Sequence, residues 1–217
     1  MHPSFWLEKW AAAQTGFHME QPHPDLVAQA STFLADGPHR VLIPLCGKSH
    51  DLAWLAARGH SVVGVELART AVQQFLAEHR RQARVHEDGD RIRFESGNLT
   101  VHCCDVLGLS PVDIGTFDRI WDRAAMVALD PPRREVYAQV LVGLLRPGGQ
   151  LLLNAFTYDQ SEMSGPPHSV PEDEVRARYA GCDVEVVRRG ETIADGKFRE
   201  RGVTAWREDL YRITKPA

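Results

Sequence analysis

The chain has 217 residues, of which 43% are hydrophobic and 25% are charged, as in a single folded domain and not in a disordered chain. Lysine and arginine number 25 against 29 aspartates and glutamates, so the formal net charge is −4 and a basic nucleic-acid-binding surface is not expected. No apolar run approaches the roughly 20 residues that span a bilayer, and the first residues lack the order of a secretion signal. Four cysteines without a Cys-x-x-Cys spacing indicate reduced thiols in a cytoplasmic protein.

The first 24 residues form an N-terminal segment with its own pattern. Trp6 and Trp10 stand one helical turn apart, and two prolines, at positions 22 and 24, then break the backbone. A helix is predicted from Pro24 to about Leu34, where Gly37-Pro38 follows as a stop signal.

Short apolar runs then alternate with amphipathic stretches. Strands are predicted at residues 41–45, 61–65, 92–95, 99–103, 117–121 and 151–156, and helices at 51–57, 68–82 and 133–145. A polar segment at 87–90 only leads into the strand that follows it. Such alternation predicts an α/β protein with a mostly parallel sheet covered by helices on both faces.

The pattern changes beyond Pro171. One helix is predicted at 172–179, and two strand-like runs at 183–189 and 203–213 follow, joined by a polar turn. They predict an antiparallel hairpin at one edge of the sheet. With no linker or internal repeat, residues 1–217 are expected to form a single domain.

A glycine turn and an acidic residue follow the first two predicted strands. Gly47 lies in the turn that begins at Leu45, and Glu66 ends the next strand, 19 positions later. At that separation a carboxylate accepts hydrogen bonds from ribose hydroxyls, whereas the absence of Gly-x-Gly-x-x-Gly argues against a pyrophosphate site. Each residue alone could be an ordinary turn or surface position. Together they favour a nucleoside-containing cofactor.

Two further acidic positions follow strands at the same edge. Asp105 could accept a hydrogen bond from an adenine amino group, and it could equally be a solvated residue after Cys103 and Cys104. Asp122 and Arg123 end another strand, where an exposed ion pair contributes only about 0–1 kcal/mol. Their position at the ligand-binding edge of the sheet makes them site candidates.

Several separated segments match one enzyme family in the correct order. They are Phe5–Trp10 with Phe17-His18, Pro44–Ser49, Arg58–Glu66, Trp121–Ala124, and Tyr158-Asp159 with Gly165-Pro166-Pro167. From residue 5 to about residue 213, the chain closely resembles the thiopurine S-methyltransferases.

This resemblance implies a Rossmann-like class I methyltransferase fold and S-adenosylmethionine as methyl donor. The residues it places at the cofactor are Trp6, Trp10, Leu45, Gly47, Glu66, Asp105, Val106 and Arg123. Residues 1–24 would form a lid in which Phe17 faces the methyl acceptor. His168 departs from the aromatic or aliphatic residue expected after Gly-Pro-Pro, and would contact the acceptor if that loop lines its pocket.

The resemblance also implies a mechanism and a substrate class. Arg123 would favour the thiolate form of the acceptor, with Asp122 orienting its guanidinium, and no metal or covalent nucleophile is expected. The acceptor would be a small thiol such as a thiopurine, or a selenol or tellurium species, methylated by a monomeric enzyme.

Two other functions would use a sheet of the same kind. A nicotinamide-dependent reductase is disfavoured by the missing glycines and the lack of a Tyr-x-x-x-Lys pair. A non-catalytic S-adenosylmethionine-binding module of the same fold remains open.

Overall fold

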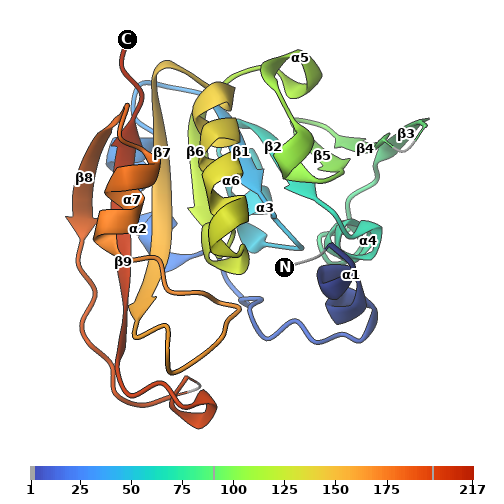
Figure 1. Ribbon diagram of the computed structural model, residues 1–217. Helices are drawn as coiled ribbons and strands as arrows, with labels where there is room; N and C mark the ends of the chain where they lie inside the picture. Colours follow the sequence, from blue (N-terminus) through green and yellow to red (C-terminus); the bar gives the residue numbers. More distant parts are fainter. Residues whose placement is uncertain (1–2, 90, 197) are drawn as a thin grey trace.

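The computed structural model describes residues 3–89, 91–196 and 198–217 (Figure 1). In chain order, its strands are β1 (Arg40–Pro44), β2 (Ser61–Glu66), β3 (Arg84–Asp88), β4 (Arg91–Ser96), β5 (Leu99–Cys103), β6 (Phe117–Arg123), β7 (Leu145–Tyr158), β8 (Asp183–Arg188) and β9 (Trp206–Thr214). The α-helices are α1 (Pro3–Ala11), α2 (Pro24–Phe33), α3 (His50–Ala57), α4 (Arg69–Glu78), α5 (Pro111–Ile114), α6 (Pro131–Leu144) and α7 (Glu172–Arg178). Short 3₁₀ turns are η1 (Val106–Gly108), η2 (Met126–Ala128) and η3 (Arg199–Arg201).

The strands form one sheet in the order β3-β4-β5-β2-β1-β6-β7-β9-β8. Neighbours from β5 through β7 pair in parallel, and antiparallel pairs lie on both sides of this centre. The predicted parallel sheet with an antiparallel C-terminal pair is therefore confirmed. Strand β9 lies between β7 and β8, and a long connection with η3 replaces the polar turn expected between the last two strands.

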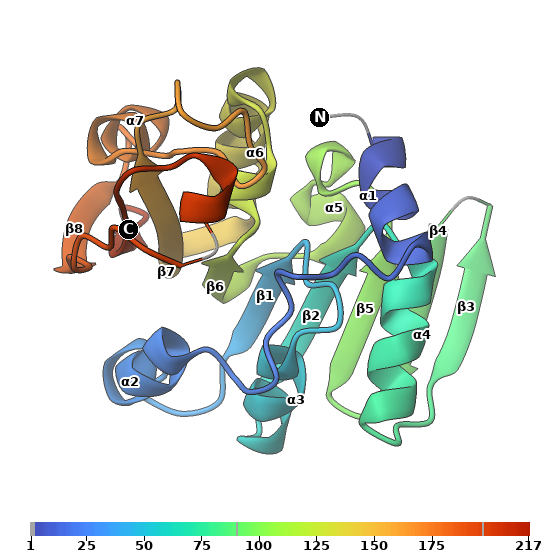
Figure 2. The same ribbon diagram turned by 90° about the horizontal axis from the view of Figure 1, so that it is seen from below.

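Helices cover both faces of the sheet, as Figures 1 and 2 show from two directions. Helices α2, α3 and α4 bury side chains such as Phe33, Leu55 and Phe75 in the core on one face. On the other face, α6 and α7 contribute Tyr137 and Val175 to a second core. Each helix buries one apolar stripe, and this burial is the main stabilising force of the layered fold.

The start of α6 shows how the sequence determines where a helix begins. Asp130 caps the helix by accepting a hydrogen bond from the Arg133 backbone amide, and Pro131 occupies the first helical position.

None of the described helices has the length and apolar character needed to cross a bilayer.

The antiparallel β3–β4 hairpin was not predicted. Strand β3 is mostly exposed and rich in charged residues, so the chain carries no apolar run or alternation there. The polar segment expected at 87–90 is partly the end of this strand, and residue 90 lies outside the described residues. An edge strand with charged side chains avoids pairing with other chains, which explains its composition.

Strand β6 directs successive side chains to opposite faces of the sheet. Trp121 and Arg123 point toward the α2–α3 side, where the Trp121 indole donates a 2.8 Å hydrogen bond to Asp51. Asp122 points toward α6 and is fully buried. Its carboxylate accepts hydrogen bonds from the Tyr137 hydroxyl at 2.8 Å and from the backbone amides of Met126 and Ala125 at 3.2 and 3.3 Å.

The expectation that Asp122 orients Arg123 is therefore wrong. Consecutive residues of a strand cannot both face the same side, and the partners of Asp122 are all on the α6 side. In the structure Asp122 anchors the turn after β6 instead.

Burial raises the pKa of Asp122 to about 6, and the three hydrogen bonds only partly oppose this effect. Because the folded protein keeps this proton to a higher pH than the unfolded chain, the contribution of Asp122 to stability is present at low pH and is lost as pH rises through about 6. We expect Asp122→Asn to gain stability relative to the natural protein between about pH 4 and pH 7, by on the order of 2 kcal/mol.

Urea unfolding of both proteins at several pH values measures this difference. A difference in unfolding free energy that stays constant with pH would contradict the assignment. Tyr137→Phe is a useful control, because it removes one hydrogen bond and leaves the carboxyl group in place.

Candidate functional site

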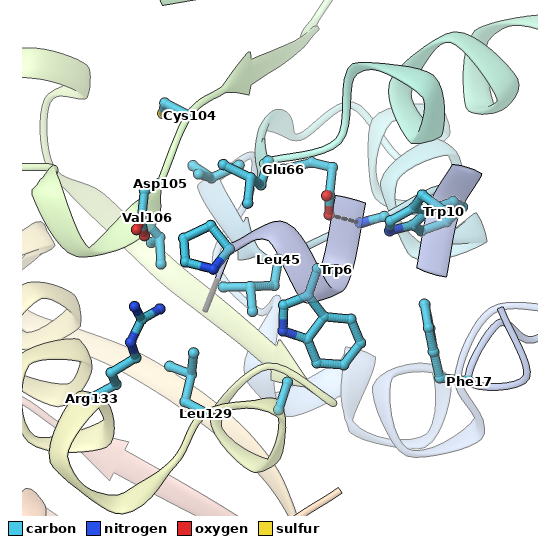
Figure 3. Close-up of a pocket in the computed structure, with 15 residues that line it drawn as sticks. Trp6, Trp10, Phe17, Leu45, Glu66, Cys104, Asp105, Val106, Leu129 and Arg133 are labelled. Carbon is cyan, nitrogen blue, oxygen red and sulfur yellow. Dashed lines mark hydrogen bonds between the residues drawn. The ribbon is translucent and has the colours of Figure 1, made fainter. Parts of the chain in front are cut away.

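Two adjacent pockets lie at the edge where the parallel strands end. The first pocket is lined by residues that follow β1, β2 and β5, together with α1 and the segment after β6 (Figure 3). The second pocket lies between α1, the end of β6 and the loop of residues 165–167. Trp6, Phe17 and Ala128 line both pockets, so the two pockets adjoin at these residues. Open α/β sheets bind ligands at this edge.

Glu66 lies at the base of the first pocket with 6% of its surface exposed. One carboxylate oxygen accepts a 2.8 Å hydrogen bond from the Gly47 amide, and the other accepts a 2.7 Å bond from the Ala68 amide. Burial raises its pKa, and these backbone hydrogen bonds act in the opposite direction. The carboxylate thus joins the turn after β1 to the start of α4.

The backbone is strained on both sides of the pockets. Leu45, directly after β1, has φ 46°, and Ala124, directly after β6, has φ 61°. Non-glycine residues rarely adopt this left-handed conformation, and residues that do are concentrated at functional sites. Both line a pocket, and neither could have been identified as strained from the sequence.

Gly47 permits close packing of the N-terminal segment. Its φ is 51°, and a Cβ atom built there would lie 2.8 Å from Cζ2 of Trp10. Any side chain at this position would therefore push Trp10 away.

An aromatic cluster holds the N-terminal segment over the site. The Phe17 ring lies edge-on to both Trp6 and Trp10, with centroid distances of 5.8 and 5.7 Å. Trp10 packs against Ala68 and Ala71 at the start of α4 and is only 4% exposed. The Trp6 indole nitrogen is buried without a hydrogen-bond partner in the described protein, which leaves a donor at the wall shared by the two pockets.

Arg123 connects the sheet to this segment. Its guanidinium donates a 2.7 Å hydrogen bond to the Phe17 carbonyl oxygen and lines the second pocket. Burial lowers its pKa, whereas the nearby carboxylates of Asp51 and Glu208 raise it. An arginine stays protonated under such conditions, so the second pocket carries a fixed positive charge.

The turn after β5 closes the far side of the first pocket. Asp105 accepts a hydrogen bond from the Leu107 amide and caps η1, and Val106 is 3% exposed. Both line the pocket (Figure 3), so the sequence placed them correctly at this edge. The neighbouring thiols are poor nucleophiles, because burial raises the pKa of Cys103 to about 12 and of Cys104 to about 11.

His168 is not where the acceptor loop was expected to place it. Gly165, Pro166 and Pro167 line the second pocket, but His168 lies beneath them, is 8% exposed, and donates its backbone amide to the Val127 carbonyl. Burial lowers its pKa. The prediction that His168 contacts the acceptor is therefore corrected to a role in supporting the loop.

Several pocket residues were missed from the sequence. Ala128 and Leu129 line the first pocket from the connection between β6 and α6, and Arg133 lines it from the first turn of α6. That connection follows a strand at the ligand-binding edge, which is the signal that could have identified it. Phe198 and Arg201 reach the second pocket from the β8–β9 connection, and no sequence pattern pointed to them.

The described residues do not bring together three histidine, cysteine, aspartate or glutamate side chains in a geometry suited to a metal ion. The arrangement offers one pocket with the Glu66 carboxylate at its base, next to an aromatic pocket that contains the Arg123 guanidinium. This combination suits two ligands held against each other.

Comparison with solved structures identifies proteins of the same fold. N-methyltransferase NodS from Bradyrhizobium japonicum WM9, in complex with S-adenosyl-L-homocysteine, matches with a TM-score of 0.69 and 16% identity, covering 100% of both chains. The 1,6-didemethyltoxoflavin-N1-methyltransferase of Burkholderia thailandensis, with bound 1,6-didemethyltoxoflavin and S-adenosylhomocysteine, matches with a TM-score of 0.66 and 18% identity, over 99% of this chain and 87% of that one. The fold is therefore that of class I methyltransferases.

Sequence comparison is more specific. Thiopurine S-methyltransferase from Pseudomonas putida F1 is 40% identical, covering 99% of this chain and 100% of its own length. The enzyme from Lycaon pictus is 37% identical over 97% of this chain and 88% of its own length. Residues 1–216 match the thiopurine S-methyltransferase family as a whole. The chain therefore belongs to the thiopurine S-methyltransferase family and is a methyltransferase.

Proposed function

We propose that this protein transfers a methyl group from S-adenosylmethionine to the sulfur of a small aromatic thiol. The observation that carries the proposal is the position of Arg123, a fixed cation in the aromatic second pocket next to the Glu66 pocket. The family name of its relatives, thiopurine S-methyltransferase, supports the same acceptor chemistry.

The residues of the first pocket fit S-adenosylmethionine. Glu66 presents a carboxylate to ribose hydroxyls, and the Asp105–Val106 turn lies where an adenine would pack. The unpartnered Trp6 indole nitrogen offers a further donor, and Trp10 and Leu45 close the sides. When bound, the cofactor supplies a methyl group activated on a positively charged sulfur.

In the second pocket the protein's task is to hold the acceptor sulfur as a thiolate. A guanidinium close to the sulfur lowers the thiol pKa by stabilising its anion. Arg123 cannot itself remove the proton, because it stays protonated. Aligning the sulfur with the methyl group then supplies much of the rate enhancement, so no covalent nucleophile is required.

The aromatic lid contributes by excluding water. Transfer from a cation to an anion gives two neutral products, so a low-dielectric site favours the transition state over the separated charges. Trp6 and Phe17 line both pockets and would cover the place where the two ligands meet.

Selenols and anionic tellurium species are acceptors of related chemistry. A selenolate presents a polarisable, negatively charged selenium, and a tellurium oxyanion carries its negative charge on oxygen beside a tellurium lone pair, so Arg123 would attract either anion. Assaying thiols, selenols and tellurium oxyanions side by side, with detection of the methylated product, ranks these acceptors. Cofactor binding without turnover of any of them would favour the non-catalytic module.

The first prediction of the proposal concerns the cofactor. Glu66→Gln keeps the side-chain shape but loses the charge, so we expect the dissociation constant for S-adenosylhomocysteine to rise at least about tenfold. Calorimetric titration measures this constant, and the thermal melting of the ligand-free variant reports whether the hydrogen bonds to Gly47 and Ala68 still form. Unchanged affinity in a stable variant would remove Glu66 from the cofactor site.

The second prediction concerns the lid. The aromatic cluster that attaches residues 4–22 is small and separate from the two main cores, so local opening should be easy without ligand. We expect amide hydrogen exchange in this segment to slow when S-adenosylhomocysteine is added. Exchange in β8, which lies at the opposite edge of the sheet from β3 and contributes to neither pocket, serves as the internal control. Equal protection with and without ligand would mean that the segment is permanently packed.

The third prediction tests the thiolate role of Arg123. Arg123→Met should lower kcat/KM most for aryl thiols whose pKa lies above the assay pH, because those thiols depend on the guanidinium to ionise. Thiols already ionised in water should lose less. A series of substituted thiophenols at saturating donor measures this dependence.

Arg123→Lys is the matched control, since it keeps the charge and should flatten the dependence on thiol pKa. A loss that is uniform across the series would contradict the thiolate role. It would indicate instead that Arg123 acts only through its hydrogen bond to the Phe17 carbonyl.

A further inference from the structure

The wall of the second pocket is unusual in its charge. Lys9 from α1, Arg123 from the end of β6 and Arg201 from η3 all line it, and among the described lining residues there is no aspartate or glutamate. The remaining surface is mainly apolar and includes the aromatic rings of Phe5, Trp6, Phe17, Phe156 and Phe198.

Each of these cations is hydrogen-bonded to an uncharged oxygen. Lys9 Nζ donates to Gln14 Oε1 at 2.6 Å, Arg123 to the Phe17 carbonyl at 2.7 Å, and Arg201 to the Pro166 carbonyl at 3.0 Å. Within residues 3–89, 91–196 and 198–217, none of them lies within 4.0 Å of a carboxylate oxygen. The carboxylates of Asp51 and Glu208 lie close enough to Arg123 to raise its pKa, so the cations of this cavity that have no carboxylate partner among the described residues are Lys9 and Arg201.

A thiolate would neutralise only part of this charge. The acceptor sulfur brings one negative charge, which the proposed function assigns to Arg123, and the two other cations would then face an uncharged ligand body. Uncompensated cations in a partly desolvated pocket attract a second anionic group much more strongly than they would in water. The charge of the wall therefore matches an acceptor with two negative groups.

Lys9 is the cation best placed to recognise the second group. It is half-buried, whereas Arg201 is exposed, and it shares α1 with Phe5 and Trp6, which form the aromatic wall. Its ammonium lies 5.4 Å from the centre of the Phe5 ring. An aromatic acceptor against that wall would bring a ring substituent toward Lys9.

We propose that Lys9 determines acceptor specificity by binding a carboxylate on the aromatic thiol, so that the enzyme prefers carboxylated aryl thiols over neutral ones. The inference rests on the proposed thiol methylation and adds a second charged contact to it. Lys9 also lies in the last turn of α1, where a positive charge stabilises the helix, so the test must separate recognition from helix stability.

A matched pair of acceptors isolates the carboxylate. 3-Mercaptobenzoate and 3-mercaptobenzamide have the same ring and nearly the same shape but differ in charge, and kcat/KM is measured for both at saturating S-adenosylmethionine. We expect the natural protein to prefer the benzoate about tenfold or more. Raising the salt concentration should reduce this preference, because it screens partly exposed charges.

Lys9→Gln should lower kcat/KM for the benzoate far more than for the benzamide and so remove most of the preference, and Lys9→Arg should retain it. Arg199→Gln is the charge control: it removes a positive charge from the same connection that carries Arg201, but Arg199 does not line the pocket. This control should leave the ratio unchanged.

The possible failures differ in meaning. Equal loss for both acceptors in Lys9→Gln, or a natural protein that does not prefer the benzoate, would overturn the specificity role while thiol methylation stands. If the natural protein methylates neither thiol, the proposed function fails, and the role of Lys9 fails with it.

Discussion

The site depends on one buried carboxylate. Glu66 ends β2 and accepts hydrogen bonds from the Gly47 amide after β1 and from the Ala68 amide before α4. Because β1 and β2 are parallel neighbours in register, their ends lie side by side, and a single side chain can join both turns. Desolvation of the charge opposes this arrangement and raises the pKa of Glu66, and the backbone donors offset that cost only in part. A ligand hydroxyl would therefore meet a carboxylate that is already oriented.

The N-terminal segment builds on the same junction. With Gly47 held by Glu66, the Trp10 ring can lie against a backbone without a Cβ atom, and this contact places α1 over the first pocket. From there the chain reaches Arg123, which fixes the Phe17 carbonyl. The segment is thus attached at two points, each belonging to the site itself. Both contacts would break if this segment opened, so a lid movement, which remains a prediction, would also disturb the site.

The sequence predicts the structure best where an apolar run marks a strand and a polar residue stands directly after that run. The apolar runs of β1 and β2 and the spacing of Gly47 and Glu66 predict the parallel sheet and the acidic position at its edge. Strand β3 was missed because its exposed residues carry no apolar pattern. The role expected for Asp122 was wrong because adjacency in sequence suggested contact with Arg123, whereas a strand separates neighbours onto opposite faces. Arg201 was missed because only tertiary packing brings its connection back to the pocket.

The two pockets differ in charge in a way that suits the chemistry. The first pocket contains Glu66 and Asp105, with Arg133 as its one lining cation among the described residues, whereas the lining of the second contains only basic charged side chains. A positively charged methyl donor in the first pocket and the proposed anionic acceptor in the second would each find the complementary field, and they would meet where the two pockets adjoin at Trp6 and Phe17. Their attraction increases when water is excluded, because the dielectric falls. Closing the lid over both ligands would therefore bring the positively charged donor and the anionic acceptor together in a site of low dielectric. Methyl transfer neutralises both charges, so such a site favours it.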